Sequence, residues 1–402
     1  MKKKITIIFL IAFLLVGCKS KLTFNSSGND RYIYDDSIVY LDDQELKDFK
    51  LVDNNYETHL PIKEDSIVKV HNDSKFNSIY IVYELSGYEG NLSYNGKNKE
   101  IGKDNIMHEY IELDEETNDI TLDYKDDAII TDIYVFSKKE EIPWWVQRWE
   151  KECDKADLLL IPAHADDEHL FFAGLIPTYV ARGYKVQIAY LTYHADNPLR
   201  YHELLDGLWN AGVTNYPVMG GIPDAYSKSL DWALENLEKD SLTEDDVIKY
   251  QVSLIRRFHP DVVVTHAENG EYGHGQHILS NYILKKALPI SDMATKFKDL
   301  DGKTWKPKKV YFHSADGTGL YLDIDKPLDY FDGKTAFNVS QDSFRFHSTQ
   351  LHSGWLYGWI YGDDDSIHSS KQITKYSPNY YTLYYSSVGE DKNNNDLFEN
   401  IK

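Results

Sequence analysis

The sequence is poor in cysteine and in basic residues, and it contains no internal repeat or low-complexity tract that would predict a fibrous or disordered chain. Its 402 residues include only two cysteines, and 43 Lys and Arg stand against 65 Asp and Glu, giving a formal net charge of −22. Nucleic-acid binding requires a clustered excess of basic side chains, so we do not expect a nucleic-acid partner. A hydrophobic content of 42% nevertheless predicts well-formed cores.

The N-terminal segment has the shape of a signal peptide. Three lysines precede an apolar run from Ile5 to Val16, which is shorter than the roughly 20 residues that a membrane-spanning helix needs. The following Leu15-Val16-Gly17-Cys18 resembles a bacterial lipobox, in which the cysteine is lipidated and becomes the first residue of the mature protein. The alternative is an ordinary secretory signal with a chance cysteine near its end.

We therefore expect residues 1–18 to be a lipoprotein signal peptide and lipobox, and the polar residues 19–30 to be a linker. A lipid on Cys18 would hold the protein at the cell membrane, on its extracytoplasmic face. The only other cysteine, Cys153, would then have no intrachain disulfide partner.

The length predicts two domains, because single cores stop growing at roughly 250 to 300 residues. Residues 31–138 contain short runs rich in Ile, Val and Tyr, separated by Asn, Asp and Gly turns, and they predict an all-β sandwich. The runs are Tyr32–Tyr34, Ser37–Leu41, Ser66–Val70, Ser78–Leu85, Ile120–Leu122 and Ile129–Phe136. The many tyrosines of this part favour core packing, with sugar stacking as the alternative.

Residues 143–402 change to an alternation of strands and helices, which predicts an α/β domain with a Rossmann-like, mostly parallel sheet flanked by helices. The expected strands are Ala156–Pro162, Lys185–Thr192, Asp261–His266 and Lys309–His313. The expected helices are Glu168–Gly183, Arg200–Ala211, Thr243–Phe258 and Gln276–Ala287. In such sheets, functional groups lie in loops beyond the carboxyl ends of the strands.

Two clusters of His and acidic residues fall at that position. The first spans 162–168 (PAHADDE) and the second spans 271–277 (EYGHGQH). Catalytic zinc takes three protein ligands from His, Asp or Glu and keeps one position open. His164, Asp167 and His277 satisfy that count, leaving Asp166 and His274 for the base and the oxyanion stabiliser that hydrolysis needs. A single histidine of this kind would be interpreted as a loop residue with a hydrogen-bonded ring and not as a metal ligand.

The segment His164-Ala165-Asp166-Asp167-Glu168 resembles the His-Pro-Asp-Asp-Glu motif of the PIG-L (LmbE-like) zinc-dependent de-N-acetylases. Tyr272-Gly273-His274-Gly275-Gln276-His277 is similar to their second metal motif. The resemblance covers residues 143–402. It departs from the family where Ala165 replaces proline and where Gly275-Gln276 replaces Pro-Asp, so the sequence leaves open what position 276 contributes near the metal.

The resemblance implies that His164, Asp167 and His277 bind the metal and that Asp166 is the general base. It implies that His274 stabilises the oxyanion or protonates the leaving amine. Tyr272 would close over the acetyl group, while Arg200 and Asp224 would hold sugar hydroxyls, with a purely structural role equally open for each of the three. The expected metal is Zn²⁺, although Fe²⁺ or another divalent ion suits the same donors.

The predicted function is hydrolysis of the acetamide of an N-acetylated sugar, an N-acetylglucosamine-type glycoconjugate, at the cell surface. We infer no protein partner. Two alternatives stay open: a lipid-anchored carbohydrate-binding protein with a vestigial site, and a zinc amidase acting on another cell-wall conjugate.

Overall fold

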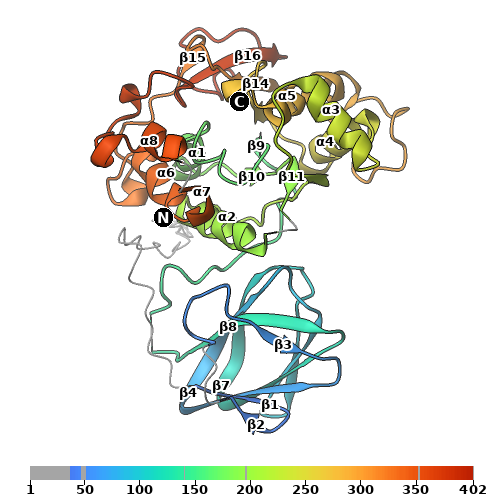
Figure 1. Cartoon of the computed structure of the whole chain (residues 1–402), viewed down its shortest axis with the longest axis vertical. Helices are drawn as coiled ribbons and strands as arrows, with labels where there is room; N and C mark the ends of the chain where they lie inside the picture. The colour runs from blue at the N-terminus through green and yellow to red at the C-terminus, as the bar shows by residue number, and fades with distance from the viewer. Residues whose placement is uncertain (1–36, 47–50, 140, 195–196, 352–353, 402) are drawn as a thin grey trace, which may run out of the picture.

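The structure is a computed structural model that describes residues 37–46, 51–139, 141–194, 197–351 and 354–401. Figure 1 shows strands β1–β8 gathered at one end of the molecule and a second sheet with surrounding helices at the other. No helix among the described residues is long and apolar enough to cross a membrane. The predicted signal peptide, Cys18, the linker and the run Tyr32–Tyr34 lie outside the described residues.

The N-terminal part contains one eight-stranded antiparallel sheet in the order β2-β1-β4-β7-β5-β6, with β8 pairing β4 and β3 pairing β8. Two strands of 17 residues, β4 and β7, pair along their length with register shifts that bend the sheet. One apolar core on it includes Val68, Ile81 and Leu122. A second cluster joins side chains of β4 and β8 to Trp145 and Val146. The strands are β1 (Ile38–Leu41), β2 (Gln44–Glu45), β3 (Leu60–Ile62), β4 (Ile67–Tyr83), β5 (Gly90–Tyr94), β6 (Lys97–Ile101), β7 (His108–Tyr124) and β8 (Ala128–Phe136).

The second sheet has six strands in the order β10-β9-β13-β14-β16-β15. The first four are parallel to one another, and β16 and β15 are added antiparallel. The strands are β9 (Leu158–Ile161), β10 (Val186–Ile188), β13 (Val262–Thr265), β14 (Lys309–His313), β15 (Leu320–Tyr321) and β16 (Tyr380–Ser386), and the short β11 (Thr192–Tyr193) and β12 (Ile222–Pro223) pair separately. The expected mostly parallel sheet is present.

Helices cover both faces of this sheet because the side chains of its buried strands alternate between two cores. Leu158 and Leu160 of β9 face a core shared with α1, α2, α6 and α8, whereas Leu159 and Ile161 face a core shared with α4 and α5. The helices are α1 (Leu175–Ala181), α2 (Pro198–Asn210), α3 (Leu230–Lys239), α4 (Glu244–Phe258), α5 (Gly275–Ala287), α6 (Ala336–Phe344), α7 (Ser348–Leu351) and α8 (Gly354–Ile360).

The helix predicted from Glu168 is wrong at its start, because α1 begins only at Leu175. The intervening residues form turns, entered at Asp166 with a φ of 138° and left at Gly174 with a φ of 77°. A Cβ at position 174 would lie 2.6 Å from the Cβ of Ile324, so close packing requires glycine there. This irregular segment carries the first His/Asp cluster.

The two parts of the molecule contact each other through polar side chains. The Tyr56 hydroxyl donates to the Asp206 carboxylate on α2, at 3.1 Å, and its ring stacks on His202. The Nε2 atom of His108 lies 2.8 Å from Nδ1 of His202, and both residues are fully buried. These contacts lie on the helix that also carries Arg200.

Candidate metal centre

The first cluster occupies the loop that leaves the carboxyl end of β9. The Ala163 N–H donates to Nε2 of His266 at 2.9 Å, which ties the loop to the end of β13. The Asp167 carboxylate accepts the His164 backbone N–H at 2.8 Å, and the Glu168 carboxylate accepts that of Asp166 at 2.9 Å. Two backbone N–H groups of the loop are thus paired with its own acidic side chains, which fixes the directions of those carboxylates.

The second cluster lies where a short 3-10 turn, η1 (Glu271–Gly273), meets α5. His274 is the N-cap of α5 and accepts the Gln276 N–H through Nδ1, while His277 lies in the first turn of the helix. A Cβ at position 275 would stand 2.2 Å from the Ser227 hydroxyl oxygen. The Gly275 N–H donates to the Ser227 carbonyl. The glycine that departs from the family motif therefore permits this close approach.

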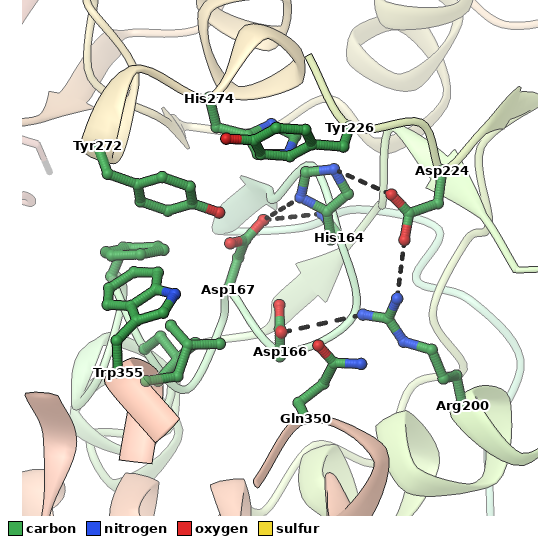
Figure 2. A pocket seen from close by; sticks show the side chains of 13 residues that line it. His164, Asp166, Asp167, Arg200, Asp224, Tyr226, Tyr272, His274, Gln350 and Trp355 are labelled. Carbon is green, nitrogen blue, oxygen red and sulfur yellow. Dashed lines mark hydrogen bonds and ion pairs between the residues drawn. The ribbon is translucent and has the colours of Figure 1, made fainter. Parts of the chain in front are cut away.

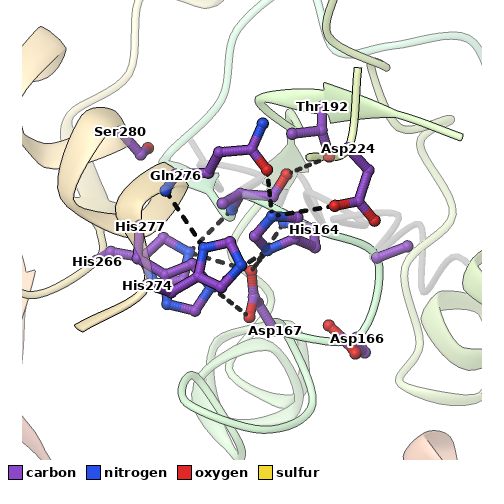
Figure 3. A network of polar contacts seen from close by, with 12 residues as sticks. His164, Asp166, Asp167, Thr192, Asp224, His266, His274, Gln276, His277 and Ser280 are labelled. Carbon is purple, nitrogen blue, oxygen red and sulfur yellow. Dashed lines mark hydrogen bonds and ion pairs between the residues drawn. The ribbon is translucent and has the colours of Figure 1, made fainter. Parts of the chain in front are cut away.

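The structure brings His164, Asp167 and His277 together. Nδ1 of His164 lies 3.2 Å from Oδ2 of Asp167 and 3.2 Å from Nε2 of His277, and that Nε2 lies 3.3 Å from Oδ1 of Asp167. Donors bound to one tetrahedral ion at about 2.1 Å stand about 3.4 Å apart. Figure 3 shows the three side chains converging from the two clusters. The spacing therefore fits a single divalent ion.

Hydrogen bonds to the other ring nitrogens decide which atoms can bind a metal. Nε2 of His164 lies 2.8 Å from the Gln276 side-chain oxygen, so it carries the proton and Nδ1 keeps a lone pair. Nδ1 of His277 lies 2.8 Å from the Glu271 carboxylate, so Nε2 keeps the lone pair. The amide oxygen of Gln276 therefore orients His164, as a carboxylate at that position would.

Two further histidines crowd the same place. Sets of donor atoms close enough for a metal include His164 with His274 and His277, and Asp167 with His266 and His277. His266 already accepts the Ala163 N–H at Nε2 and faces Glu271 with Nδ1, so neither ring nitrogen is available to an ion. His274 accepts the Gln276 N–H at Nδ1, so its neutral ring carries a proton at Nε2 and has no free lone pair. This leaves His164, Asp167 and His277 as the set with three available donors.

Glu271 is a central residue of the site that the sequence did not single out. It is fully buried, and its carboxylate lies 2.8 Å from Nδ1 of His277, 2.6 Å from Nδ1 of His266 and 2.5 Å from Nδ1 of His313. Burial alone would raise its pKa, but these histidines outweigh burial and hold the pKa well below its usual range. His313 comes from β14, so three chain segments meet at this carboxylate.

A cavity of about 340 Å³ is lined by His164 and Asp167, two of the three donors. Figure 2 shows the side chains around it. Asp166 and His274 both line it. Because His274 accepts a backbone N–H at Nδ1, its neutral ring presents an Nε2–H donor. The cavity walls are formed by His164, Asp166, Asp167, Leu170, Phe171, Arg200, Asp224, Tyr226, Tyr272, His274, Gln350, Trp355 and Leu356.

Burial and neighbouring charges shift the pKa values of the side chains around the cavity in different directions. Burial, followed by the charge of Asp167, raises the pKa of Asp166 to about 7, while Arg200 acts in the opposite direction. Burial would also raise the pKa of Asp167, but His277 and His266 outweigh it and hold that pKa well below its usual range. Burial and the neighbouring His164 and His277 lower the pKa of His274, which favours its neutral form.

Comparison with known proteins gives a match to the PIG-L family, described as GlcNAc-PI de-N-acetylase, over residues 159–288. These residues include both clusters and exclude strands β1–β8. The match is independent of the distances given above.

Curated relatives align with the same region. A 1D-myo-inositol 2-acetamido-2-deoxy-alpha-D-glucopyranoside deacetylase of Geodermatophilus obscurus is 30% identical over 178 residues, covering 39% of this chain and 60% of the relative. The protein of that name from Mycobacterium leprae is 28% identical over 180 residues, covering 39% and 58%. The chain thus spans about 60% of the length of these relatives. Among solved structures, N,N'-diacetylchitobiose deacetylase from Pyrococcus horikoshii is 14% identical with a TM-score of 0.41, covering 57% of this chain and 84% of that one.

Arg200 and Asp224 line the cavity but bind each other. Nη1 of Arg200 donates to the Asp224 carboxylate at 2.7 Å, and Nη2 donates to the Ala165 carbonyl at 2.7 Å. Asp224 also lies 3.6 Å from Nε2 of His164 and 3.3 Å from Nδ1 of His194. The pair therefore braces the first cluster, and a role in binding sugar hydroxyls stays a prediction.

Aromatic side chains form the rim of the cavity. Tyr272, predicted to close over the substrate, is 39% exposed and packs edge-on against Trp355, with ring centroids 4.9 Å apart. Tyr226 lies near His274 and is 57% exposed. Trp355 and Gln350 come from the C-terminal helices, outside the matched residues, and the sequence analysis missed them because no local motif marks them.

Proposed function

We propose that the chain is a zinc-dependent hydrolase that removes the acetyl group from an N-acetylglucosamine-type glycoconjugate. The observation that carries the proposal is the convergence of three available donors, 3.2–3.3 Å apart, on a cavity that Asp166 and His274 line. The names of the curated relatives, which are deacetylases of 2-acetamido-2-deoxy-glucopyranosides, support the same reaction class.

The donor set fits zinc, because two imidazoles and one carboxylate leave a coordination position open for catalysis. Fe²⁺ also accepts these donors and is the natural alternative. When bound, such an ion lowers the pKa of water and withdraws electron density from an amide carbonyl. The remaining chemistry belongs to side chains of the cavity.

Asp166 is the proposed general base. Its nearest cationic partner is Arg200, whose Nη2 lies 3.9 Å away, beyond hydrogen-bond distance, so a carboxylate oxygen can take a proton from the attacking water. As the carbon–nitrogen bond breaks, the same proton passes to the leaving nitrogen, giving an amine and acetic acid, which then ionises to acetate. His274 donates its Nε2–H to the developing oxyanion, and its neutral form favours this role over protonation of the amine.

The rim supports a sugar as substrate. Tyr226, Tyr272 and Trp355 are exposed beside the cavity, and aromatic faces pack well on the apolar faces of sugar rings. Asp224 keeps a side chain that is 29% exposed and that a hydroxyl could reach. An acidic protein with polar groups at a confined cavity suits a neutral glycan.

The proposed location is the extracytoplasmic face of the cell membrane, with a lipid on Cys18 as anchor. The support is the N-terminal sequence, in which a short apolar run leads to a lipobox-like segment. Globomycin treatment of cells making the full chain should cause accumulation of the unprocessed form. Normal processing of a Cys18→Ala variant under the same conditions would argue for an ordinary secretory signal.

The test of function is acetate release from a panel of N-acetylated glycans and of other cell-wall amides. We expect zinc-loaded protein to release acetate from glucosaminides, the chelated protein to be inactive, and added zinc to restore activity. Asp166→Asn should bind zinc and lose activity, while the exposed Asp240→Asn should match wild type. Activity only on other amides would support the amidase, and glycan binding without turnover would support a vestigial site.

A further inference from the structure

A second group of potential metal ligands lies outside the set described above. Glu168, His169 and His347 are fully buried, and they share no residue with the other two donor sets. Oε1 of Glu168 lies 3.3 Å from Nε2 of His347 and 3.6 Å from Nε2 of His169. These separations bracket the roughly 3.4 Å expected between donors on one tetrahedral ion.

Several polar atoms of this cluster lack a hydrogen bond of good geometry among the described residues, although Oε2 of Glu168 accepts the Asp166 N–H. Both ring nitrogens of His169, both ring nitrogens of His347 and Oε1 of Glu168 are buried and unpaired. Buried polar groups are normally paired, because leaving them unpaired forfeits their hydration without compensation. An ion pair between Glu168 and His347 would still leave the His169 ring without a side-chain hydrogen bond.

Space for an ion lies beside Gly207 of α2. A Cβ built at this glycine would stand 2.9 Å from Nε2 of His169 and 3.2 Å from Nε2 of His347. The two ring nitrogens therefore border one small volume that any other residue at position 207 would fill. The glycine keeps that volume open inside a helix, where glycine otherwise disfavours folding.

We propose that Glu168, His169 and His347 bind a second divalent metal ion of the zinc class. Two imidazoles and one carboxylate suit Zn²⁺ and related ions, and the complete burial of all three side chains indicates a structural site. The ion satisfies one ring nitrogen of each histidine and the carboxylate oxygen together.

The second ion joins the catalytic loop to the C-terminal helices. Glu168 and His169 follow directly on Asp167, whereas His347 follows α6 and precedes the segment that carries Gln350. The Glu203 carboxylate accepts from Ser348 and Thr349, which fixes the same segment from α2. The ion therefore links the loop that carries Asp167 to the segment that carries Gln350, and both residues line the cavity.

The experiment counts zinc in the full chain. Protein stripped by chelator, reloaded with Zn²⁺ and dialysed is analysed by elemental mass spectrometry. We expect two zinc ions per chain in wild type, one in His347→Ala, one in His164→Ala and none in the double variant. Gly207→Ala, which removes no ligand, should also hold one, whereas His368→Ala, an exposed histidine near the same helices, should hold two.

A wild-type count of one that falls to zero in His164→Ala would overturn the second site while leaving the proposed catalytic site intact. A count of two that persists in His347→Ala would overturn it as well. A single ion lost in His347→Ala but kept in His164→Ala would support the second site and contradict the first. The wild-type count needs no variant, so a variant that fails to fold does not prevent the test.

Discussion

Glu271→Gln should weaken zinc binding at His164, Asp167 and His277 by roughly 10- to 100-fold, which is about 1.4–2.7 kcal/mol. The Glu271 carboxylate lies against Nδ1 of His277 and so makes Nε2 a stronger donor. A neutral amide oxygen can still accept the two N–H groups that Oε2 faces, but the substitution removes the negative charge that favours the donor form of the ring.

In this variant the side-chain amide nitrogen would take the place of Oε1, which faces Nδ1 of His313 and the Ala267 N–H. His313 can adapt by accepting at Nδ1, but the Ala267 N–H would lose its acceptor. Leaving one buried donor unpaired costs about 1–3 kcal/mol of folding stability, so the variant should fold with a lowered melting temperature.

Competition with a chromophoric chelator measures the affinity. His347→Ala serves as the background, so that the proposed second site does not contribute to the titration. Glu268→Gln is the matched control, because it makes the same chemical change three residues away on a side chain that is 67% exposed. If Glu271→Gln bound zinc as tightly as Glu268→Gln, the carboxylate would have no role in orienting His277.

Three further predictions concern the base, the rim and the β1–β8 sheet. Asp166→Asn should lower kcat by about 10²–10⁴-fold with unchanged zinc content, measured by acetate release, and a smaller loss would exclude Asp166 as the base. Trp355→Ala should raise KM for a glycan about tenfold, whereas Trp232→Ala, outside the cavity lining, should not. Burial raises the pKa of Asp132 to about 7, so folding stability should fall as pH rises from about 4 to 7, by on the order of 4 kcal/mol. Thermal unfolding at pH 5.5 and pH 8 should show about half of this loss, about 2 kcal/mol, in wild type and none of it in Asp132→Asn. Equal pH dependence in both would contradict it.

Elements with strong local signals were predictable from the sequence. The helix expected from Thr243 is α4, whose capping box joins Thr243 and Asp246, and Lys309–His313 is β14 with the expected bounds. The capping box depends on contacts within a few residues. The strand pairs with distant β13 and β16, but its own apolar run marked it in the sequence. The helix expected from Glu168 begins later than predicted because tertiary contacts determine the backbone there. Asp166 adopts a positive φ, and Gly174 packs against Ile324.

The same distinction applies to the site. His164, Asp167 and His277 stand in compact clusters after strands, and chemistry alone predicted that the clusters meet. Glu271 belongs to the second cluster, but its sequence context is that of an ordinary acidic loop residue. Its partner His313 lies 42 residues away, on β14. His347 and Trp355 have no sequence pattern around them, and only the packing of the C-terminal helices brings them to the loop after β9.

The most direct measurement is diffraction from crystals of the zinc-loaded chain, recorded on both sides of the zinc absorption edge. The account predicts an anomalous peak about 2.0–2.2 Å from Nδ1 of His164, Nε2 of His277 and a carboxylate oxygen of Asp167. A fully loaded crystal with no peak between these three atoms, or with one bound elsewhere, would contradict the assignment of this centre.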